Sequence, residues 1–187
     1  MRATWLSVVL CAAVASHTLA CAEDSHIVVQ DAGNTFELTV PQSRLILSMP
    51  KGGLTIVTNQ RRIGGGTESA RYFQLTDPAE GLIVSGWFEP ARRYADLDES
   101  WRQAMEHTKK EGFPAPHDVE HSELGTWRAI LYNYSLPNLS SAHVRTSYLA
   151  AGTWIDLHVS VTSARPGSET RKQVETFVRS MQVREKQ

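Results

Sequence analysis

The sequence contains little cysteine, and this limits how the folded protein can be stabilised. Two cysteines occur in 187 residues, Cys11 and Cys21. Cys11 lies in an apolar N-terminal run and Cys21 follows shortly after it. The rest of the chain therefore has no thiol with which to form a disulfide, which excludes a small domain stapled by disulfides. A hydrophobic core must hold the domain together instead.

Long runs of charge of one sign are also missing. Lysine and arginine total 19, aspartate and glutamate total 20, and the formal net charge is −1. Both signs are interspersed along the chain, so the sequence has no basic stripe of the kind that binds phosphate backbones. The composition argues against nucleic acid as a partner.

The N-terminus has the pattern of a secretory signal peptide. A basic dipeptide precedes an apolar run over residues 5–15, and small residues continue to Ala20. Two cleavage sites fit this pattern. The segment Thr18–Cys21 resembles a bacterial lipobox, which would leave Cys21 as an acylated N-terminus, whereas an ordinary signal peptidase would cut after Ala20 or Ala22.

Both alternatives predict an exported protein. We expect residues 1–22 to be the signal peptide and residues 23–187 to form a single domain, because about 165 residues suit one domain with a sizeable core. The domain would lie in the periplasm, or at the envelope membrane if lipid chains on Cys21 anchor it. No internal repeat or linker divides this part of the sequence.

Two amphipathic helices are predicted from apolar residues at helical spacing. Asp96 is placed to cap the first helix, which should end before Gly112. Ser168 is placed to cap the second helix, which closes the chain. The apolar stripes are Leu97, Trp101, Ala104 and Met105 in the first helix, and Val174, Phe177, Val178 and Met181 in the second.

The other apolar segments favour strands, and residues 137–141 are predicted to be a loop between two of them. The clearest hairpin joins residues 143–150 to residues 153–162 across Ala151-Gly152, and its second strand alternates between apolar and polar residues. Its apolar positions, 155 to 161, should face the core under the closing helix. We therefore predict the α+β class, with a mostly antiparallel β-sheet flanked by two amphipathic helices.

This order of elements resembles the Mog1/PsbP-like fold, a sandwich of an antiparallel sheet and helices. The resemblance rests on the opening strand Phe36–Pro41, on the middle helix, and on a closing helix that finishes with Phe177–Val183. Members of this family are mostly binding or assembly factors without catalytic activity, and some are small bacterial lipoproteins. The resemblance implies a binding protein, and it carries over no site residue because no shared site motif is matched here.

Two short motifs suggest other chemistry. His117–His121 matches the H-x-x-E-H string of a group of zinc proteases, which carry both histidines on one long helix. Prolines just before this segment and Gly125 just after it favour a loop and a strand instead, with the two histidines about 13 Å apart, so no metal site is predicted. Gly64–Gly66, after Arg61-Arg62, could cradle an anion, but a flexible loop is favoured.

The polar face of the predicted hairpin is the best candidate for a functional site. A two-residue turn would place Asp156 opposite Ser147 and His158 opposite Arg145, with facing Cβ atoms about 5 Å apart. The predicted partner-binding residues are Arg145, Ser147, Trp154, Asp156 and His158.

Several functions fit this face. We favour a non-enzymatic cell-envelope protein that binds a protein partner, as an accessory or assembly factor or as an immunity-type inhibitor. The same Ser, Asp and His could instead serve a small hydrolase, although the sequence has no nucleophile elbow. A third alternative is a domain that binds a small ligand or lipid between sheet and helix. No cofactor and no catalytic residue are predicted.

Overall fold

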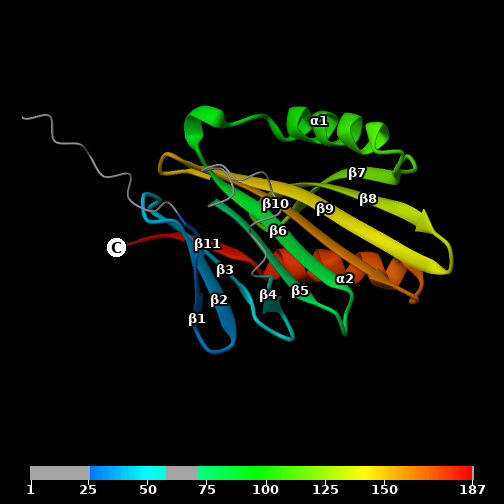
Figure 1. The fold of residues 1–187 in the computed structure, drawn as a ribbon, viewed down its shortest axis with the longest axis horizontal. Coiled ribbons are helices and arrows are strands. Elements are labelled where there is room, and N and C mark those ends of the chain that lie inside the picture. Colours follow the sequence, from blue (N-terminus) through cyan, green and yellow to red (C-terminus); the bar gives the residue numbers. More distant parts are fainter. Residues whose placement is uncertain (1–25, 58–70, 187) are drawn as a thin grey trace, which may run out of the picture.

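The computed structural model describes residues 26–57 and 71–186. Within these residues the chain forms two antiparallel sheets, two α-helices and a short 3-10 helix (Figure 1). This confirms the predicted α+β class.

The smaller sheet contains four strands, and its strand order is β1 (Val28–Asp31), β2 (Thr35–Thr39), β3 (Leu45–Pro50) and β11 (Gln182–Glu185). The larger sheet contains seven strands in the order β4 (Thr55–Ile56), β5 (Tyr72–Asp77), β6 (Leu82–Pro90), β10 (Thr153–Ser163), β9 (Leu139–Ala150), β8 (Trp127–Leu136) and β7 (His117–Leu124). The helices are η3 (Ala91–Arg93), α1 (Leu97–Lys110) and α2 (Gly167–Ser180).

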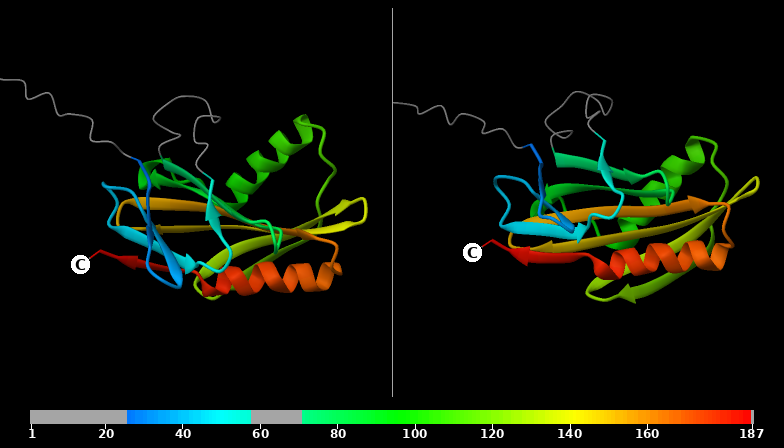
Figure 2. Two further views of the ribbon diagram at one scale, coloured as in Figure 1. Left: turned by 60° about the horizontal axis from the view of Figure 1, so that its bottom comes forward. Right: turned by 90° about the horizontal axis from the view of Figure 1, so that it is seen from below.

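The larger sheet separates two layers of different composition. Helix α1 lies over one of its faces, while the smaller sheet and α2 lie over the other (Figures 1 and 2). The main hydrophobic core fills the space between the two sheets and α2. The apolar positions of β10 belong to this core, and Ile155, Leu157, Val159 and Val161 are at most 1% exposed, as predicted.

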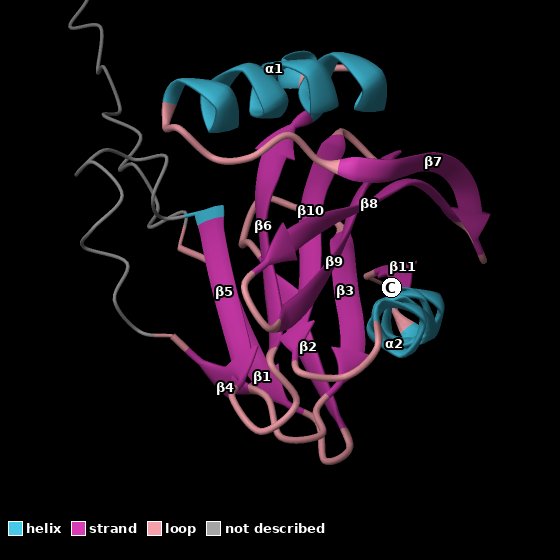
Figure 3. Cartoon of the chain, turned by 90° about the vertical axis from the view of Figure 1, so that its right-hand side faces the viewer, coloured by secondary structure: helices cyan, strands magenta, loops and turns pink. Residues whose placement is uncertain are grey.

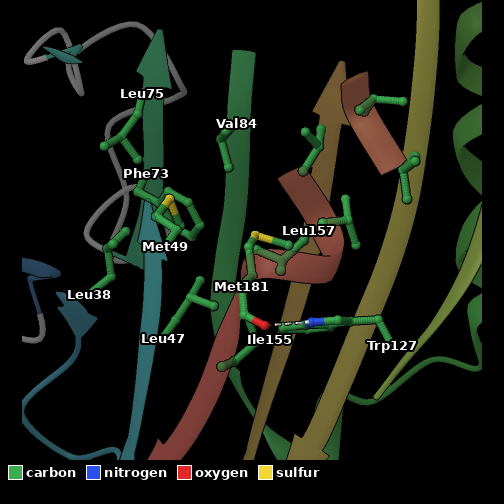
Figure 4. Close-up of a cluster of buried hydrophobic side chains, with 14 of the residues drawn as sticks. Leu38, Leu47, Met49, Phe73, Leu75, Val84, Trp127, Ile155, Leu157 and Met181 are labelled. Carbon is green, nitrogen blue, oxygen red and sulfur yellow. Dashed lines mark hydrogen bonds between the residues drawn. The ribbon is translucent and has the colours of Figure 1, made fainter. Parts of the chain in front are cut away.

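One hydrogen bond ties the end of α2 to the larger sheet. Trp127 on β8 is 1% exposed, and its indole Nε1–H donates to the carbonyl oxygen of Met181 over 3.2 Å (Figure 4). The indole thus satisfies its own donor and one of the carbonyls left without a partner at the helix end.

The second sheet is the main difference from the sequence-based prediction, which had one sheet. The predicted closing helix was expected to run to Val183, but α2 ends at Ser180 and the chain continues as β11. Val183 pairs with Leu47 on β3. Because this partner is far away in the sequence, and β11 has four residues, the local pattern does not reveal the strand.

Two local predictions were also wrong. Pro166, rather than Ser168, is the N-cap residue of α2, and it supplies no side-chain cap. The predicted loop over residues 137–141 is a two-residue turn, because Leu136 pairs with Leu139 across it. Asn138 takes a φ of 61°, a conformation that asparagine tolerates better than most residues. The predicted cap of α1 is confirmed, since the Asp96 carboxylate accepts the Asp98 N–H over 2.9 Å.

Candidate functional site

The hairpin of β9 and β10 has the predicted register. Its two turn residues have φ of 46° and 74°, the positive values that tight hairpin turns require. Asp156 lies opposite Ser147, and His158 lies opposite Arg145. The polar residues of β10 therefore share the face of the sheet that is turned away from the main core.

Helix α1 covers this face (Figure 3). Asp156 is 8% exposed and Trp154 is 9% exposed, whereas an open docking surface would leave such side chains in water. Beyond the start of the helix, the ring of Tyr94 meets that of Trp154 edge to face, with 5.7 Å between the centroids. Asp156 and Trp154 thus lie under cover and not on an open docking surface.

An ion pair lies at the centre of this face. Arg145 donates to the Asp156 carboxylate over 2.9 Å and to the hydroxyl of Ser100 on α1 over 3.2 Å. Burial raises the pKa of Asp156, and the nearby Arg145 opposes that rise. Within the part of the chain that the structure describes, Arg145 Nε and Asp156 Oδ1 are buried without hydrogen-bond partners. Such atoms are uncommon in folded proteins and require an explanation.

A row of stacked rings lies beside the ion pair. Trp101 of α1 packs on Tyr132 with 4.5 Å between centroids, Tyr132 stacks on His143 at 4.9 Å, and His143 stacks on His158 at 5.2 Å. The Tyr132 hydroxyl and His143 Nδ1 lie 3.1 and 3.0 Å from His158 Nε2. Helix α1 is therefore attached to the sheet partly through aromatic rings.

Both imidazoles of the row are neutral at pH 7. Burial lowers the pKa of His143 to about 4. Burial, followed by the charges of His143 and Arg145, lowers the pKa of His158 to about 3. A neutral pair can share one proton between His143 Nδ1 and His158 Nε2, and their separation of 3.0 Å suits such a hydrogen bond. A second proton there would bring two N–H donors face to face.

Between α1 and the sheet lies a cavity of about 310 Å³, which we call the α1 cavity. Strands β6, β8, β9 and β10 form its floor and α1 forms its roof. Its lining residues are Ser85, Gly86, Trp87, Ala104, Met105, His107, Thr108, Tyr132, Arg145, Asp156 and His158. Polar and aromatic side chains predominate in this lining.

Three of the five predicted site residues line the α1 cavity, namely Arg145, Asp156 and His158. Trp154 lies under Tyr94 instead, and Ser147 is half-buried on β9. The hydrolase hypothesis for this face requires Ser147, His158 and Asp156 to interact with one another. Asp156 instead binds Arg145, and His158 binds Tyr132 and His143. These contacts therefore do not form the triad that the hydrolase hypothesis requires.

Four residues that complete the site were not among the predicted site residues. Tyr132 and His143 face each other across β8 and β9, and Ser100 and Trp101 come from α1. The turn at residues 137–138 sets the β8–β9 register, so correct turn chemistry would have paired Tyr132 with His143. No turn or periodic pattern in the sequence indicates that α1 lies over this face.

The structure describes only one of the two short motifs singled out in the sequence. His117–His121 lies on β7, with a bulge between His117 and Glu120, so the long helix that a zinc protease needs is absent from this segment. Gly64–Gly66 and Arg61-Arg62 lie outside the described residues. Over residues 26–57 and 71–186, no three His, Cys, Asp or Glu side chains gather as metal ligands would. Neither helix described here is long and apolar enough to cross a membrane.

Comparison with known proteins finds matches among solved structures. No family model matches the chain, and no curated protein matches it. Among solved structures, the chain is similar to LpqN, which is involved in cell envelope biogenesis of Mycobacterium tuberculosis, with 10% identity, a TM-score of 0.42, and coverage of 84% of this chain and 90% of LpqN. It is also similar to a protein from Bacteroides thetaiotaomicron VPI-5482, with 11% identity and a TM-score of 0.40 over 76% of this chain and 46% of that protein.

The chain thus spans less than half of the length of the Bacteroides protein. The Mog1/PsbP-like assignment stays a prediction.

Proposed function

We propose that this protein is an exported cell-envelope domain that acts by binding a small polar ligand in the α1 cavity. The observation that carries the proposal is the cavity of about 310 Å³ over a floor of Arg145, Asp156 and His158. This volume lies at the lower end of the range found for small-molecule sites. It suits a compact ligand.

The lining of the cavity determines the chemistry of the ligand. Arg145 and Asp156 offset each other's charge, and the neighbouring His158 is neutral at pH 7, so the floor carries little net charge. Trp87 and Met105 provide apolar contact on the walls. A ligand with a planar ring and both hydrogen-bond donors and acceptors fits such a lining better than a lipid chain, because an apolar chain would leave the buried charges unsolvated.

Helix α1 is suited to admit a ligand. Two of its side chains are buried, Leu97 and Ser100, and both lie in its first turn. Ala104 and Met105 further along are half-buried and line the cavity. A helix with so little buried surface can separate from the sheet at low cost. Its movement would also uncover the buried atoms of Arg145 and Asp156 that lack partners.

Filling the cavity should abolish binding. We expect Ala104→Trp to reduce ligand occupancy at least tenfold, because the indole would occupy space that the ligand needs. Glu106→Trp is the matched control, since Glu106 is exposed on the same helix. Native mass spectrometry of protein purified from its own envelope measures occupancy. Equal occupancy in the wild type and in Ala104→Trp, or a wild type that neither carries nor takes up small molecules from an envelope extract, would contradict the proposal.

Export and anchoring concern residues outside the described part of the chain, and they remain predictions. If Cys21 is acylated, Cys21→Ser should move the protein from the membrane fraction to the soluble envelope fraction, because a lipid-bearing cysteine provides the attachment. The mass of the mature N-terminus gives an independent measurement. An unmodified N-terminus at Cys21 or Glu23 would exclude the anchor and leave ordinary export.

The predicted envelope protein partner also remains a prediction. Leu149 lies opposite Trp154 at the uncovered end of this face and is 48% exposed. A protein partner would therefore meet this end of the face, beside Tyr94, rather than the covered floor.

A further inference from the structure

A second cluster of polar side chains lies on the edge strand β7 and its neighbour β8, away from the α1 cavity. The hydroxyl of Ser135 lies 3.0 Å from His117 Nε2. The other ring nitrogen, His117 Nδ1, lies 2.8 Å from the carboxylate of Asp118. A serine, an imidazole and a carboxylate linked in this order have the arrangement of an activated nucleophile, its base and the group that orients the base.

The backbone is bent to make this arrangement. His117 pairs with Asn133 across β7 and β8, and the register shifts between His117 and Glu120. At this bulge Asp118 has a φ of 52°, a conformation that is uncommon outside glycine and concentrated at functional sites. Asn133 Nδ2 donates to the Asp118 carboxylate over 3.1 Å, and Arg171 of α2 donates to the Asp118 carbonyl oxygen over 3.2 Å.

These contacts keep Asp118 ionised. The hydrogen bonds from Asn133 and then His117 lower the pKa of Asp118. An ionised carboxylate at Nδ1 keeps the proton of a neutral His117 on that nitrogen and leaves Nε2 free to accept the Ser135 proton.

The three residues border a cavity of about 430 Å³. Leu136, Leu139 and Ala142 form an apolar part of its wall. The first residues of α2, Gly167 and Ser168, form another part, and their N–H groups have no acceptor within the helix. N–H groups at a helix start stabilise a developing negative charge on oxygen. The cavity therefore brings together a serine, an imidazole, a carboxylate, the N–H groups of a helix start and an apolar wall for a short acyl group.

We propose that Ser135, His117 and Asp118 form a hydrolytic centre for small carboxylic esters with a short apolar acyl group, an activity beyond the ligand binding proposed above. Ser135 Oγ attacks the ester carbonyl carbon while His117 Nε2 takes the hydroxyl proton. His117 then gives that proton to the leaving alkoxide as the ester C–O bond breaks, which releases an alcohol and leaves an acyl-serine.

Water completes the cycle. A water molecule attacks the acyl carbonyl while His117 takes one of its protons. The bond to Ser135 Oγ breaks, His117 returns the proton to that oxygen, and a carboxylic acid leaves. Ser135 and His117 are the catalytic residues. Asp118 is a positioning residue, because it acts on the ester through His117.

The test uses the mature protein and p-nitrophenyl butyrate. We expect Ser135→Ala to lower kcat/KM by about 100-fold or more. Asp118→Asn should lower kcat by a similar factor with little change in KM, because asparagine tolerates the positive φ but carries no charge. Ser140→Ala is the matched control, since Ser140 lines the same cavity and should stay within about twofold of the wild type, as expected for a residue outside the chemistry.

Covalent labelling gives a second readout. A fluorophosphonate should attach to Ser135, as peptide mass spectrometry would show, and Asp118→Asn should slow the labelling. Ser135 is exposed, so its replacement should leave the fold intact, which circular dichroism checks. The proposal is overturned if folded wild-type protein hydrolyses the ester no faster than Ser135→Ala, or if Ser135 remains unlabelled. Either failure leaves binding in the α1 cavity unaffected.

Discussion

We expect Asp156→Ala to lower the free energy of unfolding by about 3 kcal/mol, since removing one partner of a buried ion pair leaves the other charge uncompensated. Arg145 donates to the Asp156 carboxylate over 2.9 Å, and the two side chains are 20% and 11% exposed. The remaining exposure of Arg145 places the effect at the lower end of the range for buried pairs. Urea denaturation at pH 7 measures it.

Two further variants separate this explanation from a general intolerance of the site. The double variant Arg145→Met/Asp156→Leu should regain most of the free energy of unfolding that Asp156→Ala loses, because apolar side chains of similar size replace both charges. Glu37→Ala should cost about 1 kcal/mol or less, as is usual for exposed pairs, since Glu37 binds Arg184 with side chains 24% and 53% exposed. A double variant no more stable than Asp156→Ala would show that burial of the charge is not the cause.

We also expect the domain to lose about 4 kcal/mol of stability between pH 7 and pH 5 through His143 and His158, at about 2 kcal/mol for each imidazole. The unfolded chain binds protons at these residues near pH 6.5, whereas burial lowers the folded pKa values to about 4 and about 3. The unfolded state therefore gains protons first, and stability falls as the pH drops below about 6.5. This contribution levels off below about pH 3.

The dependence on pH, rather than the stability at one pH, tests the role of the histidines. We expect the double variant His143→Asn/His158→Asn to lose less free energy of unfolding between pH 7 and pH 5 than the wild type. Only the loss due to other titratable groups should remain, even if the double variant is less stable at pH 7. His121→Gln is the matched control, because the side chain of His121 is 62% exposed. Urea denaturation midpoints of the wild type and the variants at pH 7 and pH 5 measure the pH dependence. An unchanged pH dependence in the double variant would refute the assignment.

Local patterns were sufficient to predict the parts of the fold that depend on neighbouring residues. The alternation along β10 identified its core face, and the turn at Ala151-Gly152 gave the register that places Asp156 opposite Ser147. The cap at Asp96 and the apolar stripe of α1 located that helix. In each case the signal lies within one or two elements, where periodicity and turn chemistry are informative.

Features that depend on contacts between distant segments could not be predicted in this way. The strand β11 pairs with β3, and four residues are too few to show a period. The partner of Asp156 was also open, because Ser147 and Arg145 both lie on its face. Arg145 became the partner because its longer side chain reaches both Asp156 and Ser100 of α1. Burial under α1 favours this pairing, since a buried carboxylate requires a cation nearby.

The same limit applies to the cluster on β7 and β8. The H-x-x-E-H string contains His117 and His121, and the sequence predicted a loop and a strand there without a metal site. In the structure His117 contacts Asp118 and Ser135, because the bulge after His117 turns the chain. A one-residue irregularity in a strand changes which side chains meet, and nothing in the period of the sequence marks it.

Methyl NMR of the methionines tests the central claim, ligand binding in the α1 cavity, most directly. Met105 lines the cavity, whereas Met49 and Met181 lie in the main core on the other side of the larger sheet and are 1% and 2% exposed. The protein is labelled with 13C-methyl methionine and mixed with the small-molecule fraction of an envelope extract. We expect the Met105 signal to shift while those of Met49 and Met181 stay in place. An unchanged Met105 signal, or a shift confined to the core methionines, would contradict this claim.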